Sequence, residues 1–317
     1  MTEIALINIA PLFRDPNDST LDYQIAEAFA TTSGLLVTGF PGYKTLDGTA
    51  HQLQSFFALP ETVKRTLALR KAQPGNRNLY RGFTPLPTEP HWAYNEIFDM
   101  GPEPPLPAPG LPSTAAFEES NVWPDEATAP GWQHAMTAYG ALCRRIISLM
   151  VPAALRGLGK PATAGAHLTA GRNGVLRLLH YPVVPEGFEL LNHDPETDAQ
   201  GRRMITREHV DTGVLSILWQ DEKGGLQFQG RDGLWREVPK APGALSVHCG
   251  DLLEPIGGPQ LAGTPHRVLG GYSDRCSIGY FGEPEFETLI DTPHDQGRKS
   301  YGRYLTDQFP TRFLQPA

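Results

Sequence analysis

The segment EHVDTGVLSILWQDEKGGLQ (Glu208–Gln227) is the stretch of sequence that decides the fold. It places a short apolar run, GVLSILWQ, between polar residues and a Gly-Gly turn, which is typical of a strand in a β-rich protein. Similar runs recur on both sides of it, as GVLRLLHYPVV, GGLQFQG, GLWREV, GALSVHCGDLLEPI and RCSIGYF. About eight such runs between Val175 and Phe286 predict a closed or double-sheet β-fold of the jelly-roll type.

The same segment carries a candidate metal site. His209 and Asp211 lie two positions apart, and residues at this spacing in an extended chain project to one face. His266 follows later, in TPHRV. Two imidazoles and one carboxylate form the facial triad of non-haem Fe(II) oxygenases, whereas zinc is more often held by four protein ligands. We therefore predict Fe(II) at these three residues and interpret the other histidines, including His248, as structural or surface residues.

A second pattern lies close behind the predicted metal site. Arg275 and Ser277 stand in the run RCS, so they also share one strand face. A guanidinium is a planar fork that binds a carboxylate, and a serine hydroxyl adds another donor. This pair fits the distal carboxylate of 2-oxoglutarate, whose 2-oxo acid end would chelate the iron. Tyr181, in LRLLHYP, is predicted to supply a third hydrogen bond.

Outward from this core, the first third of the chain reads as mixed α/β. We expect strands at Ile4–Ile9 and Leu35–Thr38. Helices are predicted over residues 21–32, 52–59, 61–69 and, most clearly, 131–159, where apolar residues recur every three or four positions. The Pro- and Gly-rich stretch between them, residues 74–130, should be irregular apart from short elements such as Glu96–Met100.

These elements define the expected organisation of the chain. The fold class is mainly β with flanking helices: a double-stranded β-helix (jelly-roll) core with an N-terminal α/β region packed on it. The expected boundaries are residues 1–173 for the N-terminal region, 174–290 for the core, and 291–317 for a C-terminal helix. Gln227–Val238 is predicted to form a hairpin around Arg231-Asp232-Gly233.

Composition narrows the class of protein further. The chain has 317 residues, with 27 Lys+Arg against 35 Asp+Glu and a formal net charge of −8. A net acidic surface argues against a nucleic-acid partner, because phosphate affinity depends on clustered cations. No apolar run reaches the roughly 18 residues of a membrane span, and the first residues lack a secretory signal. Three cysteines without a CxxC spacing fit reduced thiols, so we expect a cytoplasmic protein without a membrane partner.

The chain resembles the isopenicillin N synthase-like family of iron/2-oxoglutarate-dependent dioxygenases over nearly its whole length. The N-terminal motifs that carry this resemblance are INIAPL, TTSGLLVTGFPG, FFALPETVK, YRGFTP, EIFDMG and NVWP. The C-terminal motifs are LRLLHYPV, EHVDTGVLSILWQDEKGGLQ, GDLLEPIGG, TPHRV, RCSIGYF and SYGRYL. The later half is also similar to the bacterial ethylene-forming enzyme of this family.

The resemblance implies both a reaction and its residues. The family's iron ligands fall on His209, Asp211 and His266, and its 2-oxoglutarate contacts fall on Arg275, Ser277 and Tyr181. An enzyme of this kind uses Fe(II), 2-oxoglutarate and O2 to oxidise an unactivated C–H bond of a small metabolite, with release of succinate and CO2. Hydroxylation is the default outcome, and desaturation or cyclisation stay open.

Substrate contacts are harder to predict, and for each candidate packing is the alternative interpretation. The candidates are Arg81, Phe83, Glu96, Phe98, Trp219 and Phe281. The polar stretch Pro185–Arg207 is interpreted either as a solvated loop or as a lid over the substrate. Two other functions stay open: an iron oxidase of the same fold that does not use 2-oxoglutarate, and a catalytically silent metal- or ligand-binding β-barrel. The sequence identifies neither the prime substrate nor the oligomeric state.

Overall fold

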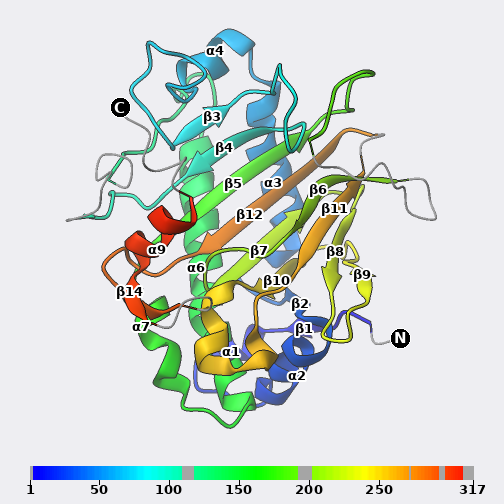
Figure 1. Cartoon of the computed structure of the whole chain (residues 1–317), viewed down its shortest axis with the longest axis vertical. Coiled ribbons are helices and arrows are strands. Elements are labelled where there is room, and N and C mark those ends of the chain that lie inside the picture. Colours follow the sequence, from blue (N-terminus) through cyan, green and yellow to red (C-terminus); the bar gives the residue numbers. More distant parts are fainter. Residues whose placement is uncertain (1–2, 109–117, 192–201, 271–272, 293–296, 310–317) are drawn as a thin grey trace.

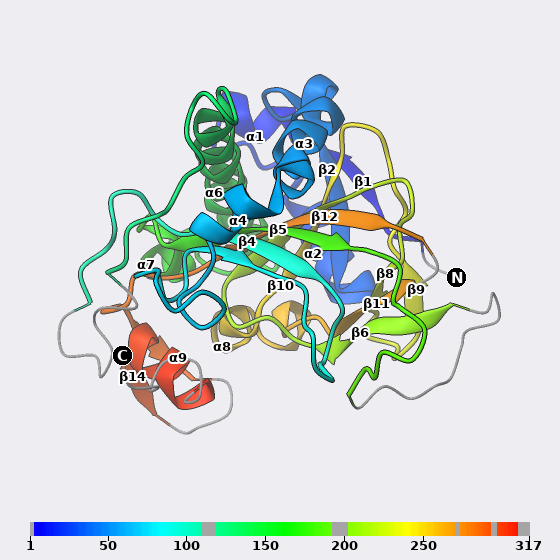
Figure 2. The same cartoon turned by 90° about the horizontal axis from the view of Figure 1, so that it is seen from above.

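Two facing β-sheets form the centre of the protein (Figures 1 and 2). The computed structural model describes residues 3–108, 118–191, 202–270, 273–292 and 297–309. The larger sheet has eight strands, in the order β1 (Leu6–Asn8), β2 (Gly34–Thr38), β10 (Leu245–Cys249), β7 (Leu215–Gln220), β12 (Arg275–Gly282), β5 (Gly174–Tyr181), β4 (Glu96–Met100) and β3 (Gly82–Thr84). The smaller sheet has four, in the order β6 (Arg203–His209), β11 (His266–Gly270), β8 (Leu226–Gln229) and β9 (Trp235–Glu237).

The strand pattern confirms the predicted jelly roll. The neighbouring strands of both sheets are antiparallel except β1 and β2, which run parallel. Eight of the described strands, β5 to β12, lie between Gly174 and Gly282, and β8 and β9 form the predicted hairpin. A separate pair, β13 (Leu289–Asp291) and β14 (Arg298–Ser300), follows the core.

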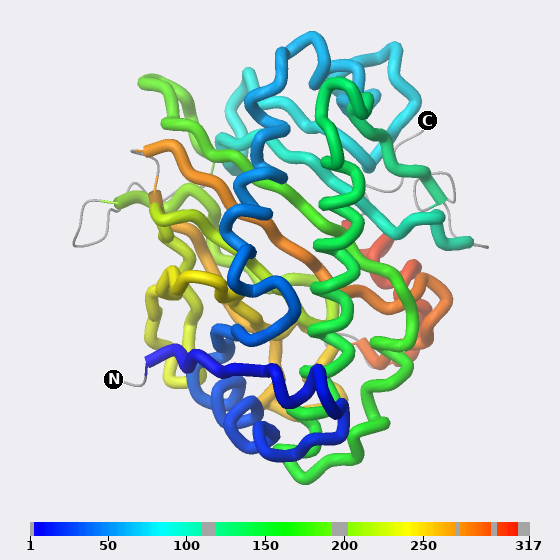
Figure 3. Tube along the Cα trace, turned by 180° about the vertical axis from the view of Figure 1, so that it is seen from behind, coloured from blue at the N-terminus to red at the C-terminus, as the bar shows by residue number. Residues whose placement is uncertain are grey.

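Helices cover the outer face of the larger sheet, as the view from behind shows (Figure 3). The helices before the core are α1 (Ala10–Arg14), α2 (Asp22–Thr32), α3 (Leu46–Gln54), α4 (Glu61–Thr66), α6 (Trp132–Gly157) and α7 (Ala166–Thr169). Later in the chain come α8 (Glu254–Gly257) and α9 (Tyr301–Gln308). Among the described helices, α6 alone is long and apolar enough to cross a membrane, and 61% of its most apolar window is buried inside the protein.

Helix boundaries differ from the sequence prediction at several places. The helix expected over residues 52–59 begins earlier, as α3 at Leu46, and gives way to a 3-10 turn over Ser55–Ala58. Leu46, Ala50 and Leu53 are buried, so the apolar spacing starts before the stretch that suggested the helix. The C-terminal helix predicted over residues 291–317 is shorter in the structure: Arg298–Ser300 form the strand β14, and the helix α9 covers only Tyr301–Gln308. Residues 293–296 and 310–317 of the predicted span lie outside the described residues.

Each central strand of the larger sheet separates two environments, because successive side chains point to opposite faces. On β5, Leu176 and Leu178 belong to the core beneath the helices, whereas Tyr181 belongs to a second cluster between the two sheets. On β12, Ile278 and Tyr280 likewise face the helices. The odd-numbered residues of both strands therefore point into the space between the sheets.

We predict that Phe98→Ala lowers the free energy of unfolding by about 3–5 kcal/mol, because it leaves a cavity in a packed aromatic cluster. Phe98 is fully buried on the helix side, with its ring centroid 4.6 Å from that of Phe56 and 4.9 Å from that of Trp132. Urea denaturation measures this loss. The folded variant should bind 2-oxoglutarate as the wild type does, and a lost 2-oxoglutarate site would contradict the assignment of Phe98 to the core.

Candidate active site

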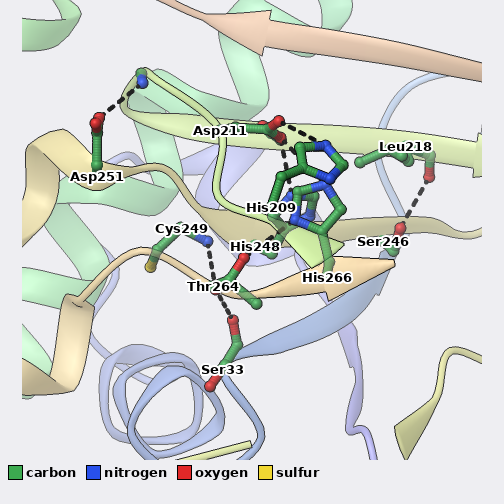
Figure 4. Close-up of polar contacts among 12 residues, drawn as sticks. Ser33, His209, Asp211, Leu218, Ser246, His248, Cys249, Asp251, Thr264 and His266 are labelled. Carbon is green, nitrogen blue, oxygen red and sulfur yellow. Dashed lines mark hydrogen bonds and ion pairs between the residues drawn. The ribbon is translucent and has the colours of Figure 1, made fainter. Parts of the chain in front are cut away.

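Three separated residues converge where the two sheets meet. His209 is the last residue of β6 and His266 the first of β11, and the two are paired across these antiparallel strands. Asp211 follows in the turn after β6, and Figure 4 shows its carboxylate beside the imidazoles. One ligand atom from each of the three residues lies within 4.8 Å of the others. The structure thus brings together the residues predicted as a metal triad.

Local hydrogen bonds orient both imidazoles for a metal. His209 Nδ1 lies 2.8 Å from the carbonyl oxygen of Arg207, and His266 Nδ1 lies 3.1 Å from that of Thr264. A carbonyl only accepts, so each Nδ1 carries a proton, and in the neutral ring Nε2 is the nitrogen with a lone pair. These Nε2 atoms lie 3.6 and 3.7 Å from the Asp211 carboxylate. Lone pairs that face a carboxylate repel it, and a cation between them removes the repulsion; the donor set therefore fits Fe(II).

Two donors from the larger sheet hold the Asp211 carboxylate. Ser216 Oγ donates to Oδ2 over 2.5 Å, and His248 Nε2 lies 3.1 Å from the same oxygen. His248 is completely buried, and its Nδ1 has no hydrogen-bond partner. An unprotonated Nδ1 without a partner costs less than an N–H without one, so His248 is the neutral tautomer that donates from Nε2. Oδ1 of Asp211 is left for the ion.

Burial and neighbouring charges set the protonation of the triad. Burial lowers the pKa of His266 to about 3, and only Asp211 and a backbone hydrogen bond oppose this change. Burial alone would raise the pKa of Asp211. At the low pH where this carboxyl titrates, the imidazoles around it are protonated, and their charge, that of His266 first, together with the hydrogen bond from His248, holds the pKa of Asp211 well below its usual range. An ionised carboxylate and a neutral imidazole are the forms that bind a metal ion.

The C-terminal helix supports the turn that carries Asp211. Tyr301 donates from its hydroxyl to the carbonyl of Thr212 over 3.3 Å, and the Tyr304 hydroxyl donates to the Asp251 carboxylate. Asp251 in turn accepts from the backbone N–H of Gly213 and donates its own N–H to the carbonyl of Asp211. Hydrogen bonds at Asp211, Thr212 and Gly213 therefore hold the backbone of this turn.

The three residues predicted to contact 2-oxoglutarate also lie together. Arg275 pairs with Tyr181 across β12 and β5, its guanidinium carbon lies 5.1 Å from the tyrosine ring centroid, and its Nη1 donates to Ser277 Oγ over 3.2 Å. Its Nε donates to the carbonyl of Gly224. Arg275 is 3% exposed and forms no ion pair with any described residue. A buried guanidinium without a counter-charge fits an anionic co-substrate.

A cavity of about 450 Å³ adjoins the triad. His209 and Asp211 form one part of its wall, and Arg81 and Arg177 form another. Apolar side chains complete the wall, among them Val175, Phe281, Phe286, Leu305 and Phe309. A cavity of this size, with an apolar lining and a few charged groups, is typical of a small-molecule site.

Both parts of the chain are similar to known protein families. Two family models match: one described as the 2OG-Fe(II) oxygenase superfamily over residues 172–284, and one described as the N-terminal region of non-haem dioxygenases in morphine synthesis over residues 4–126. Together they span both the helical region and the jelly roll. The chain belongs to the isopenicillin N synthase-like family of 2-oxoglutarate-dependent dioxygenases. Enzymes of this family require Fe(II), 2-oxoglutarate and O2.

Individual relatives agree with this membership. A 2-oxoglutarate-dependent dioxygenase from Aspergillus rugulosus is 28% identical, over 80% of this chain and 79% of its own length. The isopenicillin N synthase of Streptomyces clavuligerus is 24% identical, over 95% and 93%. The crystal structure of a full-length Neurospora crassa protein in complex with alpha-KG superposes with a TM-score of 0.75 at 22% identity, over 97% of this chain and 96% of that one. This last likeness shows the shared fold.

Four of the candidate substrate contacts in this dioxygenase do not line the cavity. Phe83, Phe98 and Trp219 belong to the core beneath the helices, where Trp219 donates to Asp47. Glu96 shares the face of Phe98 on β4 and pairs with Lys64 and His180. All four side chains point to the helix side, because successive residues of a strand alternate between its two faces. Arg81 and Phe281 do line the cavity.

Sequence reasoning missed three residues around the dioxygenase site. Arg177 lines the cavity, and its guanidinium binds Asp99 through two hydrogen bonds of 2.7 and 2.8 Å. His248 was interpreted as structural, yet it contacts the carboxylate of the candidate metal triad, Asp211. One signal could have found Arg177: it lies four positions before Tyr181 on β5, so the two side chains share a face. No comparable signal pointed to Asp99, because β4 is covered on both sides.

A second group of metal-ligating residues lies on the other face of the larger sheet. It comprises His180, Asp274 and Cys276. His180 uses both ring nitrogens, Nδ1 at 2.8 Å from Glu96 and Nε2 at 2.9 Å from Asp274, while burial raises the pKa of the Cys276 thiol to about 12. An imidazole whose two nitrogens are both in hydrogen bonds and a protonated thiol are poor metal ligands, so this group is an ion-pair network.

We predict that His248→Leu raises the dissociation constant for Co(II), used as a substitute for Fe(II), by about 10- to 100-fold, because Asp211 loses the donor that orients it. His248→Gln, which keeps an N–H donor, should recover part of this affinity. Anaerobic titration followed by visible absorption of the bound Co(II) measures both. Wild-type affinity in the folded leucine variant would contradict the role assigned to His248.

We also predict a pH-dependent stability from His180. Burial lowers its pKa, but the hydrogen bonds and charges of Glu96 and Asp274 outweigh burial and raise it above 6.5. Its contribution is therefore complete below pH 6.5 and is lost as the pH rises through the raised value. His180→Gln should lower the free energy of unfolding more at about pH 6 than at about pH 9. The exposed His134→Gln should show no such difference, and equal losses at both pH values for His180→Gln would contradict the network.

Proposed function

We propose that this dioxygenase oxidises an unactivated C–H bond of a small metabolite, with Fe(II) held by His209, Asp211 and His266. The observation that supports this most directly is the orientation of the two imidazoles: each donates from Nδ1 to a backbone carbonyl and directs Nε2 at the same carboxylate. Bound together, Fe(II), O2 and 2-oxoglutarate would supply the oxidising power, with 2-oxoglutarate leaving as succinate and CO2.

The residues of the chain hold and orient the reactants. Arg275 and Ser277 offer N–H and hydroxyl donors to the distal carboxylate of 2-oxoglutarate, and Tyr181 lies beside the guanidinium. Because these residues are nearly inaccessible to solvent, the charge pair would form in a medium where its attraction is strong. The apolar part of the cavity wall excludes water from the target bond, which limits attack on other groups.

An iron oxidase that does not use 2-oxoglutarate is less well supported. Such an enzyme would leave the buried guanidinium of Arg275 without a counter-charge during turnover, and burial of an unpaired charge is costly. The relatives named as 2-oxoglutarate-dependent enzymes also favour the main function. Hydroxylation is proposed as the default reaction, and a proline hydroxylase from Petromyces alliaceus is among the relatives, at 28% identity.

The proposed setting is the cytoplasm, with no nucleic-acid or membrane partner. The three cysteines are free thiols, and burial raises the pKa of Cys249 to about 12, so that this thiol resists oxidation. The formal net charge of −8 disfavours binding to nucleic acid.

Turnover of 2-oxoglutarate tests the proposed function. Purified protein with Fe(II), ascorbate and 2-oxoglutarate should form succinate, and His209→Ala should abolish this product by removing a metal ligand. Titration of 2-oxoglutarate without O2 should produce the visible charge-transfer band of its iron complex. Arg275→Met should weaken that titration by about 10- to 100-fold, because a charged hydrogen bond is lost.

The outcome separates the two enzyme classes. Iron binding and O2 consumption without the charge-transfer band would favour the oxidase. A protein that binds iron normally after His209→Ala would contradict the metal site itself. Arg145→Met, at an exposed position of α6, serves as the matched control and should leave the titration unchanged.

A further inference from the structure

Two arginines of the described residues are buried, Arg81 and Arg275, and only Arg275 is assigned to 2-oxoglutarate. Arg81 is 7% exposed, precedes β3 in the chain and lines the cavity beside the triad. Its Nε is buried without a hydrogen-bond partner, and its Nη atoms donate to no described residue. A buried guanidinium has five N–H donors to satisfy, so an unbonded one is costly to the folded protein.

Two of the carboxylates near Arg81 are engaged elsewhere. Asp99 is bound by both nitrogens of Arg177, and Glu119 accepts the backbone N–H groups of Leu79, Tyr80 and Arg81. Glu119 therefore anchors the backbone that carries Arg81 without touching its guanidinium. The side chain also lies directly against Gly101, where an added Cβ would come within 2.2 Å of the guanidinium carbon. Arg81 is held in place, and no described carboxylate pairs with it.

The other charged residues of the cavity wall also favour an anion. Arg177 uses Nε and Nη2 for Asp99, which leaves Nη1 without a hydrogen bond to a described residue. Arg207 also lines the cavity, and Glu283 is the one carboxylate of its described wall outside the triad. Burial lowers the pKa of Arg81, which Glu283 and Asp99 oppose. With a metal dication in the triad, the excess of positive charge attracts an anion.

From this geometry we propose that the prime substrate is a small carboxylic acid whose carboxylate binds Arg81, with Arg177 as a second donor. This inference rests on the proposed function, since it concerns the substrate of the same site. The hydrocarbon part of the acid would lie along Phe281 and Phe286, between the guanidinium and the triad. A carboxylate binds a guanidinium through two parallel hydrogen bonds. This two-point contact would fix the position of the carbon to be oxidised.

The test uses a matched acid and amide as probes. The full chain is loaded with Fe(II) and saturating 2-oxoglutarate without O2, and 3-phenylpropanoate or 3-phenylpropanamide is added. Calorimetry and the change in the visible iron band report binding. We expect the acid to bind about 10- to 100-fold more tightly than the amide. Arg81→Met should reduce this ratio to about one, Arg81→Lys should give an intermediate ratio, and Arg145→Met should keep the wild-type ratio.

Two further measurements separate this proposal from the others. If Arg81 served 2-oxoglutarate, Arg81→Met would weaken the 2-oxoglutarate titration, which we expect to stay within twofold of the wild type. Removal of a buried unpaired charge should also raise the melting temperature of the ligand-free protein, which shows that the variant is folded. Equal binding of acid and amide to the wild type, binding of neither, or an unchanged ratio in Arg81→Met would overturn the proposal. A wild type without the iron–2-oxoglutarate band would instead contradict the proposed function.

Discussion

The position of the Asp211 carboxylate depends on both sheets at once. Ser216 on β7 and His248 on β10 hold it from the larger sheet, while the lone pairs of His209 and His266 face it from the smaller one. The candidate ligands come from the smaller sheet and the turn after β6, whereas the donors that hold the carboxylate come from the larger sheet. The site therefore exists only when the jelly roll is closed, and the many apolar contacts that close it also bring the ligands together.

Much of this could be predicted from sequence, because short patterns determined it. Apolar runs divided by turn residues predicted the strands, and an imidazole two positions from a carboxylate predicted two of the three candidate metal ligands. Strand alternation then explains why Arg275 and Ser277 lie together. Residues two positions apart on a strand share a face, so local spacing is enough to place this pair.

The remainder depended on which face of a strand points inward, which alternation alone does not decide. On β4, Glu96 and Phe98 face the helices and Asp99 faces the interior, yet both sides of the strand are buried. A strand covered on both sides has no polar face to mark its orientation. His248 was hidden for the same reason, since every residue of β10 is buried and its partner Asp211 lies 37 positions away.

Alternation along β5 and β12 also gives neighbouring positions different surroundings. The odd-numbered residues face the space between the sheets, where Val175, Arg177 and Phe281 line the cavity, whereas the even-numbered ones pack on the side of α6 and its neighbours. A descendant of this protein could acquire a different substrate through changes at Val175 or Phe281 while the apolar core beneath the helices stays the same. Because the pleat of the sheet separates its two faces, the face toward the cavity could change during evolution while the face toward the helices is conserved for packing.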